Sequence, residues 1–103
     1  MMKILHLTLK KKWFDLIASG EKVFEYREYK PYWQKRISFQ HYDEIHFKNG
    51  YAKDVPFMRV VYNGYSVIDE NVDMKMDNGE ILEKSKAYFV LYLGKVLETK
   101  NHE

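Results

Sequence analysis

The stretch GEKVFEYR, from Gly20 to Arg27, decides how the first part of this chain folds and where its charges gather. A glycine at the start suits the left-handed position after a helix, so the stretch predicts a helix end followed by a strand. Glu25 and Arg27 are separated by one residue and therefore project from the same face of that strand. Lys22 has the opposite parity, but from the start of the strand its long side chain can swing round the edge.

Charges gathered where one element ends and the next begins have two interpretations. The first is a site for an anionic or richly hydrogen-bonding ligand, with Lys22 and Glu25 as a catalytic acid–base pair and Arg27 as a clamp for phosphate, carboxylate or carbonyl groups. The second is a structural salt-bridge network or a solvated strand face with no chemistry. At the level of sequence both interpretations stay open.

The residues before this stretch predict a strand and then a helix. Ile4 to Leu9 alternates between two faces, as a half-buried strand does. Lys11 to Ser19 follows with an apolar stripe that includes Trp13 and Leu16, as expected for an amphipathic helix. The second strand is predicted over 22–28. Thr8 and Lys10, at the end of the first strand, are expected near the charged residues, and Lys10 is a candidate ligand-binding residue.

The next segment, YKPYWQKR over residues 29–36, has the composition most typical of a binding surface. Pro31 favours a first helical turn. Tyr32 and Trp33 lie among lysines and an arginine, and rings interleaved with cations stack on bases and meet phosphates. Both aromatic residues are therefore candidate ligand-binding residues. The alternative is a loop held on the protein by these two rings, with the cations solvated.

The remainder of the chain predicts further strands separated by turns. Strands are expected over 43–48, 57–62, 65–69 and 87–93, the last being apolar and central, with a frayed tail from residue 98. Asn49-Gly50 predicts a tight turn, and Asn78-Gly79 predicts another after a Met-rich segment over 72–76. Asn63-Gly64 predicts a type I′ hairpin, since both residues accept positive φ.

These elements predict an α+β, mainly β fold: a small barrel of five or six strands with one or two short helices packed on it. A chain of 103 residues is expected to form a single domain over residues 1–103. The sequence contains 6 Phe, 9 Tyr and 2 Trp, and most of these rings are expected to fill the barrel.

Composition excludes several classes of protein. The absence of cysteine rules out disulfides and thiolate metal sites and fits a cytoplasmic location. The four histidines have no metal-ligand spacing, so no metal site is predicted, and no motif indicates a cofactor. No apolar run is long enough to span a membrane. The formal net charge of +2 is low for a phosphate-binding protein and disfavours duplex DNA as the partner.

The motif G-x-K-x-x-E-x-R after a short amphipathic helix resembles the signature of the ASCH domain, a member of the PUA-like group of small barrels. Here it reads GEKVFEYR, and the preceding Leu7-Thr8-Leu9-Lys10 and helix are also similar. The resemblance is sharp over residues 4–33 and lies only in the pattern of elements beyond them. It implies a PUA-like barrel and a ligand cleft between the helix and the barrel.

The resemblance implies binding of RNA, a nucleotide or a modified nucleoside, with Lys22, Glu25 and Arg27 lining the cleft. Some ASCH-type proteins hydrolyse acylated cytidine nucleosides with the motif lysine, a threonine and a distant glutamate. Lys22 matches the lysine, but Glu25 stands where the threonine is expected; Glu70 lies in the region of the distant glutamate. A small hydrolase acting on acylated cytidines or on RNA is therefore the alternative. A protein-interaction domain with a structural charge network is the second alternative.

Overall fold

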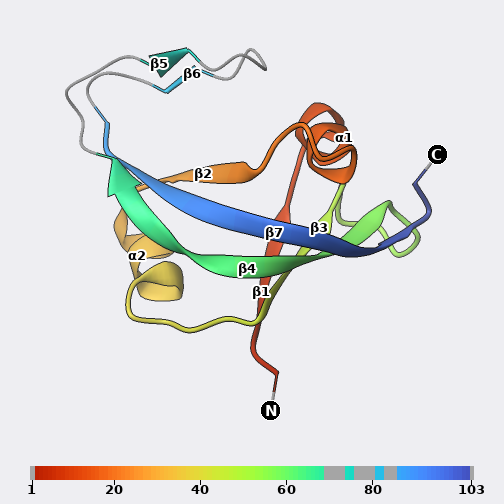
Figure 1. Cartoon of the computed structure of the whole chain (residues 1–103), viewed down its shortest axis with the longest axis horizontal. Helices are drawn as coiled ribbons and strands as arrows, with labels where there is room; N and C mark the ends of the chain where they lie inside the picture. The colour runs from red at the N-terminus through yellow and green to blue at the C-terminus, as the bar shows by residue number, and fades with distance from the viewer. Residues whose placement is uncertain (1, 69–73, 76–80, 83–85, 103) are drawn as a thin grey trace.

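The computed structural model describes residues 2–68, 74–75, 81–82 and 86–102, which are mainly β with two short helices (Figure 1). In chain order the elements are β1 (Ile4–Thr8), α1 (Lys11–Ala18), β2 (Phe24–Glu28), α2 (Pro31–Ile37), β3 (Glu44–Lys48), β4 (Phe57–Ile68), β5 (Met74–Lys75), β6 (Ile81–Leu82) and β7 (Tyr88–Lys100). No helix within the described ranges is both long and apolar enough to cross a membrane.

Five strands form one curled sheet, an open half-barrel, in the order β1-β3-β4-β7-β2. The strands β1 and β2 are therefore the two edges of this sheet. The pairing of β1 with β3 is parallel, and the other neighbours in the sheet are antiparallel. β5 and β6 form a separate two-stranded sheet. The prediction of an α+β, mainly β fold with short helices is confirmed at this level.

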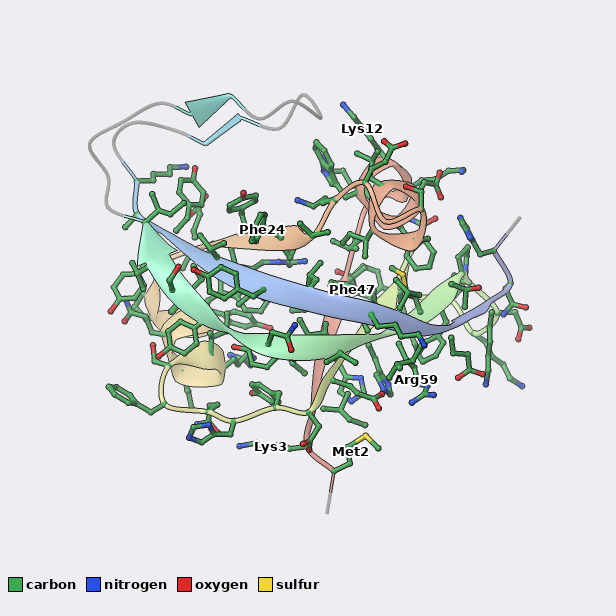
Figure 2. All side chains as sticks on the ribbon, in the orientation of Figure 1. Met2, Lys3, Lys12, Phe24, Phe47 and Arg59 are labelled. Atoms are coloured by element: carbon green, nitrogen blue, oxygen red, sulfur yellow. The ribbon has the colours of Figure 1, made fainter. Side chains whose placement is uncertain are left out.

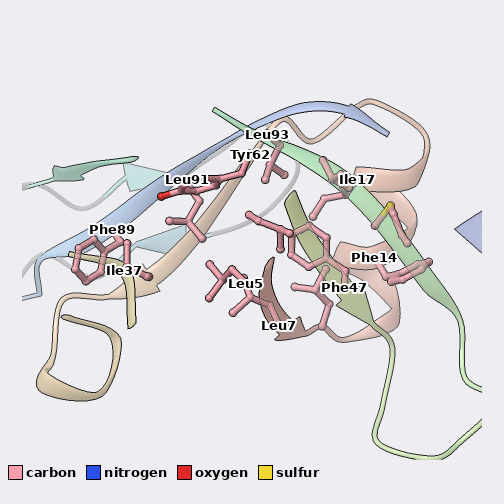
Figure 3. Close-up of a cluster of buried hydrophobic side chains, with 14 residues drawn as sticks. Leu5, Leu7, Phe14, Ile17, Ile37, Phe47, Tyr62, Phe89, Leu91 and Leu93 are labelled. Carbon is pink, nitrogen blue, oxygen red and sulfur yellow. The ribbon is translucent and has the colours of Figure 1, made fainter. Parts of the chain in front are cut away.

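Apolar side chains from both helices and from four strands fill the inside of the curl (Figure 3). Phe47 lies among them, whereas Lys12 projects outward from α1 (Figure 2). Burial of these side chains is the main favourable term in folding. The core consists of Leu5, Leu7, Leu9, Phe14, Ile17, Ile37, Ile45, Phe47, Met58, Val60, Tyr62, Phe89, Leu91 and Leu93.

The helix α1 ends as the sequence predicts, and the turn after it leads directly into the charged motif at the start of β2. Phe14 and Ile17 face the core at 1% exposure each, which anchors the helix. Gly20 adopts a φ of 88°, in the left-handed region that favours glycine. The backbone N–H of Lys22 then donates to the carbonyl oxygen of Leu16 at 3.0 Å. This turn fixes Lys22 immediately before β2.

The hairpin predicted at Asn63-Gly64 is wrong, because β4 runs through these residues without reversing. The whole of β4 pairs with β7, and the register shifts between Tyr62 and Tyr65. Gly64, at a φ of 96°, accommodates this bulge in place of a turn. Opposite it, a Cβ on Gly94 would lie 2.8 Å from the side-chain nitrogen of Asn63, so the two strands approach closely only with glycine there.

The structure also differs from the tight turn predicted at Asn49-Gly50 and from the frayed tail predicted from residue 98. Residues 49–56 form a loop between β3 and β4, in place of a tight turn at Asn49-Gly50. The expected frayed tail is strand as far as Lys100, because Glu98, Thr99 and Lys100 pair with the start of β4. The apolar strand over 88–93 has a neighbour on each side, as expected of an inner strand. The predicted turn at 78–79 lies outside the described residues.

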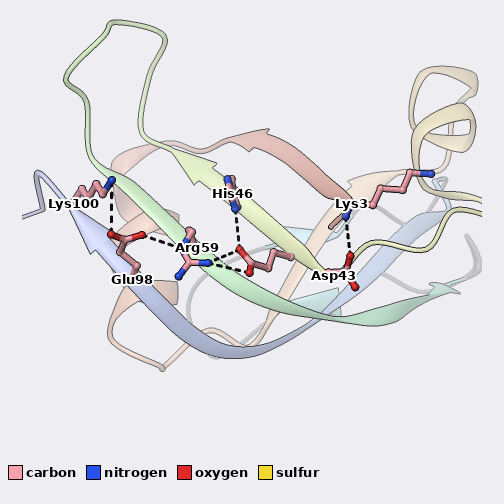
Figure 4. Close-up of polar contacts among 7 residues, drawn as sticks. Lys3, Asp43, His46, Arg59, Glu98 and Lys100 are labelled. Atoms are coloured by element: carbon pink, nitrogen blue, oxygen red, sulfur yellow. Dashed lines mark hydrogen bonds and ion pairs between the residues drawn. The ribbon is translucent and has the colours of Figure 1, made fainter. Parts of the chain in front are cut away.

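Glu44 is a buried carboxylate at the centre of a charged network on β3, β4 and β7 (Figure 4). Its Oε1 atom lies 2.9 Å from His46 Nε2, and Arg59 Nη1 donates to both carboxylate oxygens at 3.0 Å. Arg59 Nε also donates to Glu98 at 2.9 Å. The bond to His46, followed by those to Arg59, holds the pKa of Glu44 below its ordinary value of 4.5.

We expect Glu44→Gln to be less stable than the wild type at neutral pH and to lose that deficit in acid. A carboxyl with a lowered folded pKa stabilises the fold above its unfolded pKa, and the contribution disappears as the pH falls through the folded value. Urea unfolding at several pH values between neutral and acid measures this. Asp54→Asn, on an exposed loop, is the control. A deficit that is the same at every pH would contradict the assignment.

Candidate functional site

The three charged side chains of the motif meet around the carboxylate of Glu25. Glu25 Oε1 lies 3.7 Å from Lys22 Nζ. On the other side of the carboxylate, Arg27 places Nε at 2.9 Å and Nη2 at 2.7 Å from Oε2. Glu25 and Arg27 share one face of β2 because they are two residues apart, and Lys22 reaches them from the turn before the strand. Each carboxylate oxygen therefore has a cationic neighbour.

Burial distinguishes the members of this group. Lys22 and Glu25 are 3% and 4% exposed, whereas the side chain of Arg27 retains 17% of its surface. Burying a charge is costly unless it is paired and hydrogen-bonded, so the lysine and the glutamate depend on each other. Arg27 is the most exposed of the three side chains.

Aromatic rings enclose both cations. Lys22 Nζ lies 4.8 Å from the ring centre of Tyr26 and 5.5 Å from that of Trp13 on α1. The guanidinium carbon of Arg27 lies 5.0 Å from the ring centre of Trp33 on α2. Cation–π contacts of this kind are favourable and fix the direction of the side chain. The two helices therefore position the two cations of the motif.

Arg27 also connects the two edges of the sheet. Its Nη2 atom donates to the backbone carbonyl of Thr8 at 3.1 Å, and Thr8 is the last residue of β1. Because β1 and β2 are the edge strands, this bond bridges the opening of the half-barrel. The charged cluster thus lies at the seam of the sheet, between strands that have no backbone ladder with each other.

An open cavity of about 340 Å³ lies at this seam. Its volume is within the range of small-molecule sites. Cations, carboxylates and rings all contribute to its wall, and the residues come from β1, α1, β2, the start of β7 and the segments between them. The lining consists of Thr8, Leu9, Lys10, Trp13, Glu25, Tyr26, Arg27, Glu28, Lys30 and Tyr88.

The structure brings only part of the predicted site to this cavity. Lys10, Glu25 and Arg27 line it, whereas Lys22 lies beneath the surface against Glu25. Trp33 packs behind Arg27 and against the core. Tyr32 is half exposed and lies outside the lining.

The ring of Tyr32, a candidate ligand-binding residue, is already in contact with a cation. The guanidinium carbon of Arg36 lies 3.6 Å from the ring centre of Tyr32, so this ring already has a cation on it. Glu70 lies outside the described residues. Among the residues that the structure does describe, no group of three or more His, Asp or Glu side chains is arranged to hold a metal ion.

Several lining residues were missed by the sequence reasoning. Tyr88 reaches the cavity because β7 pairs with β2, where it stands opposite Glu28. Nothing in the local pattern of either residue indicates that pairing. Lys30 belongs to the segment whose composition indicated binding, but the sequence favoured its aromatic neighbours. Trp13 was assigned to the apolar stripe of the helix, and the structure places it against both the core and the cavity.

Comparisons of this chain with protein-family models, with curated proteins and with solved structures find no match.

We expect Glu25→Gln to destabilise the fold by about 3 kcal/mol, because it leaves the buried Lys22 charge facing a neutral amide. The substitution keeps the size and shape of the side chain, so packing contributes little to the effect. Urea unfolding at neutral pH measures the change. Glu21→Gln makes the same chemical change on an exposed neighbour and is the matched control. Equal stability of the two variants would show that the Lys22–Glu25 pair does not support the fold.

Proposed function

We propose that this chain is a PUA-like domain of the ASCH type that binds RNA, a nucleotide or a modified nucleoside in the cavity at the sheet seam. The observation that carries the proposal is the position of Arg27. Glu25 and the Thr8 carbonyl hold its guanidinium at the wall of a cavity of about 340 Å³. A fixed guanidinium suits phosphate and carbonyl oxygens.

The rest of the cavity wall fits the same class of ligand. Lys10 and Lys30 are exposed and add positive charge beside Arg27. Tyr26 and Tyr88 add aromatic residues to the wall, and aromatic rings are what bases stack on. The carboxylate of Glu28, which pairs with Lys86 at 3.2 Å and with Lys30 at 3.8 Å, adds a hydrogen-bond acceptor to the wall. Cations for phosphates, rings for bases and an acceptor for base edges support a nucleotide-like ligand.

The role that we assign to Lys22 and Glu25 is to orient Arg27. Both oxygens of Glu25 have cationic neighbours, so its lone pairs are already directed at Lys22 and Arg27. A general base must reach the proton that it abstracts, and Lys22 is buried beneath the cavity wall. These contacts favour binding over catalysis by this pair.

Single-stranded RNA or a small nucleotide fits the charge of the chain better than duplex DNA. The formal net charge is only +2, and the cavity wall combines three cations with two carboxylates. Duplex binding depends on many phosphate contacts. A cytoplasmic site of action belongs to the same proposal and is supported by the absence of cysteine.

We expect the double variant Lys10→Ala/Lys30→Ala to bind single-stranded RNA oligonucleotides about tenfold more weakly at low salt, because two cations beside the cavity are lost. The slope of log affinity against log salt is expected to fall by about 0.7 for each phosphate contact removed. Fluorescence anisotropy at several salt concentrations measures both quantities. Lys10 makes no side-chain cap on α1, so its loss leaves the helix intact.

The matched control is Lys53→Ala/Lys95→Ala, which removes the same charge from exposed positions outside the cavity. Equal affinity of the two double variants would overturn the placement of the site. Absence of RNA and nucleotide binding in the wild type would favour the third candidate, a protein-interaction domain whose charge network is structural.

The alternative function, hydrolysis of acylated cytidines or of RNA, is supported by the pairing of Lys22 with Glu25 in aromatic surroundings. If the chain is a binding domain, we expect no product when it is incubated with N4-acetylcytidine or with total RNA and the mixture is examined by mass spectrometry. Product that forms with the wild type and is absent with Lys22→Ala would establish the hydrolase and contradict the orienting role of this pair.

A further inference from the structure

A second and larger hollow, of about 490 Å³, lies away from the sheet seam. The loop after α2 and the bulge of β4 form its wall. Four aromatic rings line it, those of Phe39, Tyr42, Tyr62 and Tyr65. The rings of Tyr42 and Tyr62 meet edge to face, with their centres 5.8 Å apart. The bulge that replaces the expected hairpin is what presents Tyr62 and Tyr65 on the same hollow.

The polar groups of this hollow are uncharged amides and an imidazole. Gln40, His41 and Asn63 stand among the rings, and the wall contains no lysine, arginine, aspartate or glutamate within the described residues. Just beyond the lining, the ammonium of Lys3 donates to Gln40 Oε1 and lies 5.2 Å from the centre of the Tyr42 ring. A purely apolar ligand would cover these polar groups without giving them hydrogen bonds. The wall suits a neutral ring that carries hydrogen-bonding groups on its edge.

The hydroxyl of Tyr62 is the strongest sign that the hollow has an occupant. Tyr62 is 8% exposed, and its buried hydroxyl has no hydrogen-bond partner among the described residues. Burial raises the pKa of Tyr62 to about 12, so the hydroxyl keeps its proton and remains a donor. A buried donor without a partner destabilises the fold, and native structures contain few of them.

The rim of the hollow contains a second unfavourable feature. Phe39 has a φ of 59°, in the left-handed region, and its residue surface is 93% exposed. A bulky residue rarely adopts this backbone conformation, and strained residues cluster at binding sites. The Phe39 N–H donates to the hydroxyl of Tyr65 at 3.3 Å, which ties the rim to the wall. The exposed ring of Phe39 therefore stands at the edge of the aromatic hollow, where a flat ligand could meet it.

We propose that this hollow binds a nucleobase, with Phe39 and the tyrosine rings contacting its faces and Tyr62 donating to an acceptor on its edge. Bases combine a flat aromatic face with both donors and acceptors, which is the combination that the rings and amides of the wall match. The Tyr62 hydroxyl is buried, so this contact requires a rim side chain to move when the base enters.

The helix α2 contacts residues of both the hollow and the seam cavity. Trp33 of α2 packs on Arg27 at the seam, whereas the hydroxyl of Tyr42 in the hollow donates to the carbonyl of Arg36 at the other end of the helix. The guanidinium of Arg36 lies over Tyr32 on the same helix. The inference extends the proposed function, on which it rests, by adding a base site to the phosphate or carbonyl site at Arg27.

Tyr62→Phe tests this inference because it changes folding and binding in opposite directions. Removing the unpartnered hydroxyl is expected to raise the melting temperature. The same change is expected to weaken the binding of ribonucleosides about tenfold, because the base loses a buried hydrogen bond. The probes are adenosine, cytidine, guanosine and uridine, measured one at a time by NMR titration. Tyr51→Phe, on a ring that is 92% exposed, is the control.

Unchanged nucleoside affinity in Tyr62→Phe, or no binding of any of the four nucleosides to the wild type, would overturn the inference. A different result would contradict the proposed function: equal RNA affinity of Lys10→Ala/Lys30→Ala and its control. Uridine and a short oligouridylate distinguish the sources of the base. Equal affinities for uridine and the oligouridylate indicate a free nucleoside as the ligand. Tighter binding of the oligouridylate that is lost in Tyr62→Phe indicates an RNA strand. Both outcomes support a base site.

Discussion

The contact between Arg27 and Glu25 is the interaction on which the seam of this protein depends. The curled sheet leaves β1 and β2 as edges without a shared ladder. Arg27 joins them by donating from Nη2 to the Thr8 carbonyl, and it points that way because Glu25 accepts from its Nε atom. Glu25 is in turn compensated by Lys22. A side-chain network therefore bridges two edge strands that the backbone leaves unpaired with each other.

The same network places a cation at the wall of a cavity, so residues that bridge the seam also line the candidate site. Arg27 is oriented from behind by Glu25 and Trp33, which reduces the freedom that it would lose on meeting a ligand. A guanidinium fixed in this way is suited to a ligand oxygen that occupies one defined position. Lys10 and Lys30 are exposed and add charge beside it, and Lys30 Nζ lies 3.8 Å from Glu28.

Local sequence predicted the first part of the fold well and the later part less well, for a physical reason. The helix over 11–18 and the strands on either side follow from periodicity and from the positive φ of Gly20, which are properties of neighbouring residues. Asn63-Gly64 has the local chemistry of a hairpin, but pairing with β7 along the length of β4 prevailed. Positive φ is compatible with a turn and with a bulge, and only the strand partner distinguishes them.

By itself the sequence determined that Glu25 and Arg27 share a face, that Lys22 precedes them after a helix end, and that the fold is mainly β. The tertiary structure alone decided that Lys22 is buried while Arg27 lines a cavity, and that Tyr88 joins it from the far end of the chain. Parity along a strand is a local property of the backbone, whereas burial and cavity walls depend on which distant strands and helices pack together.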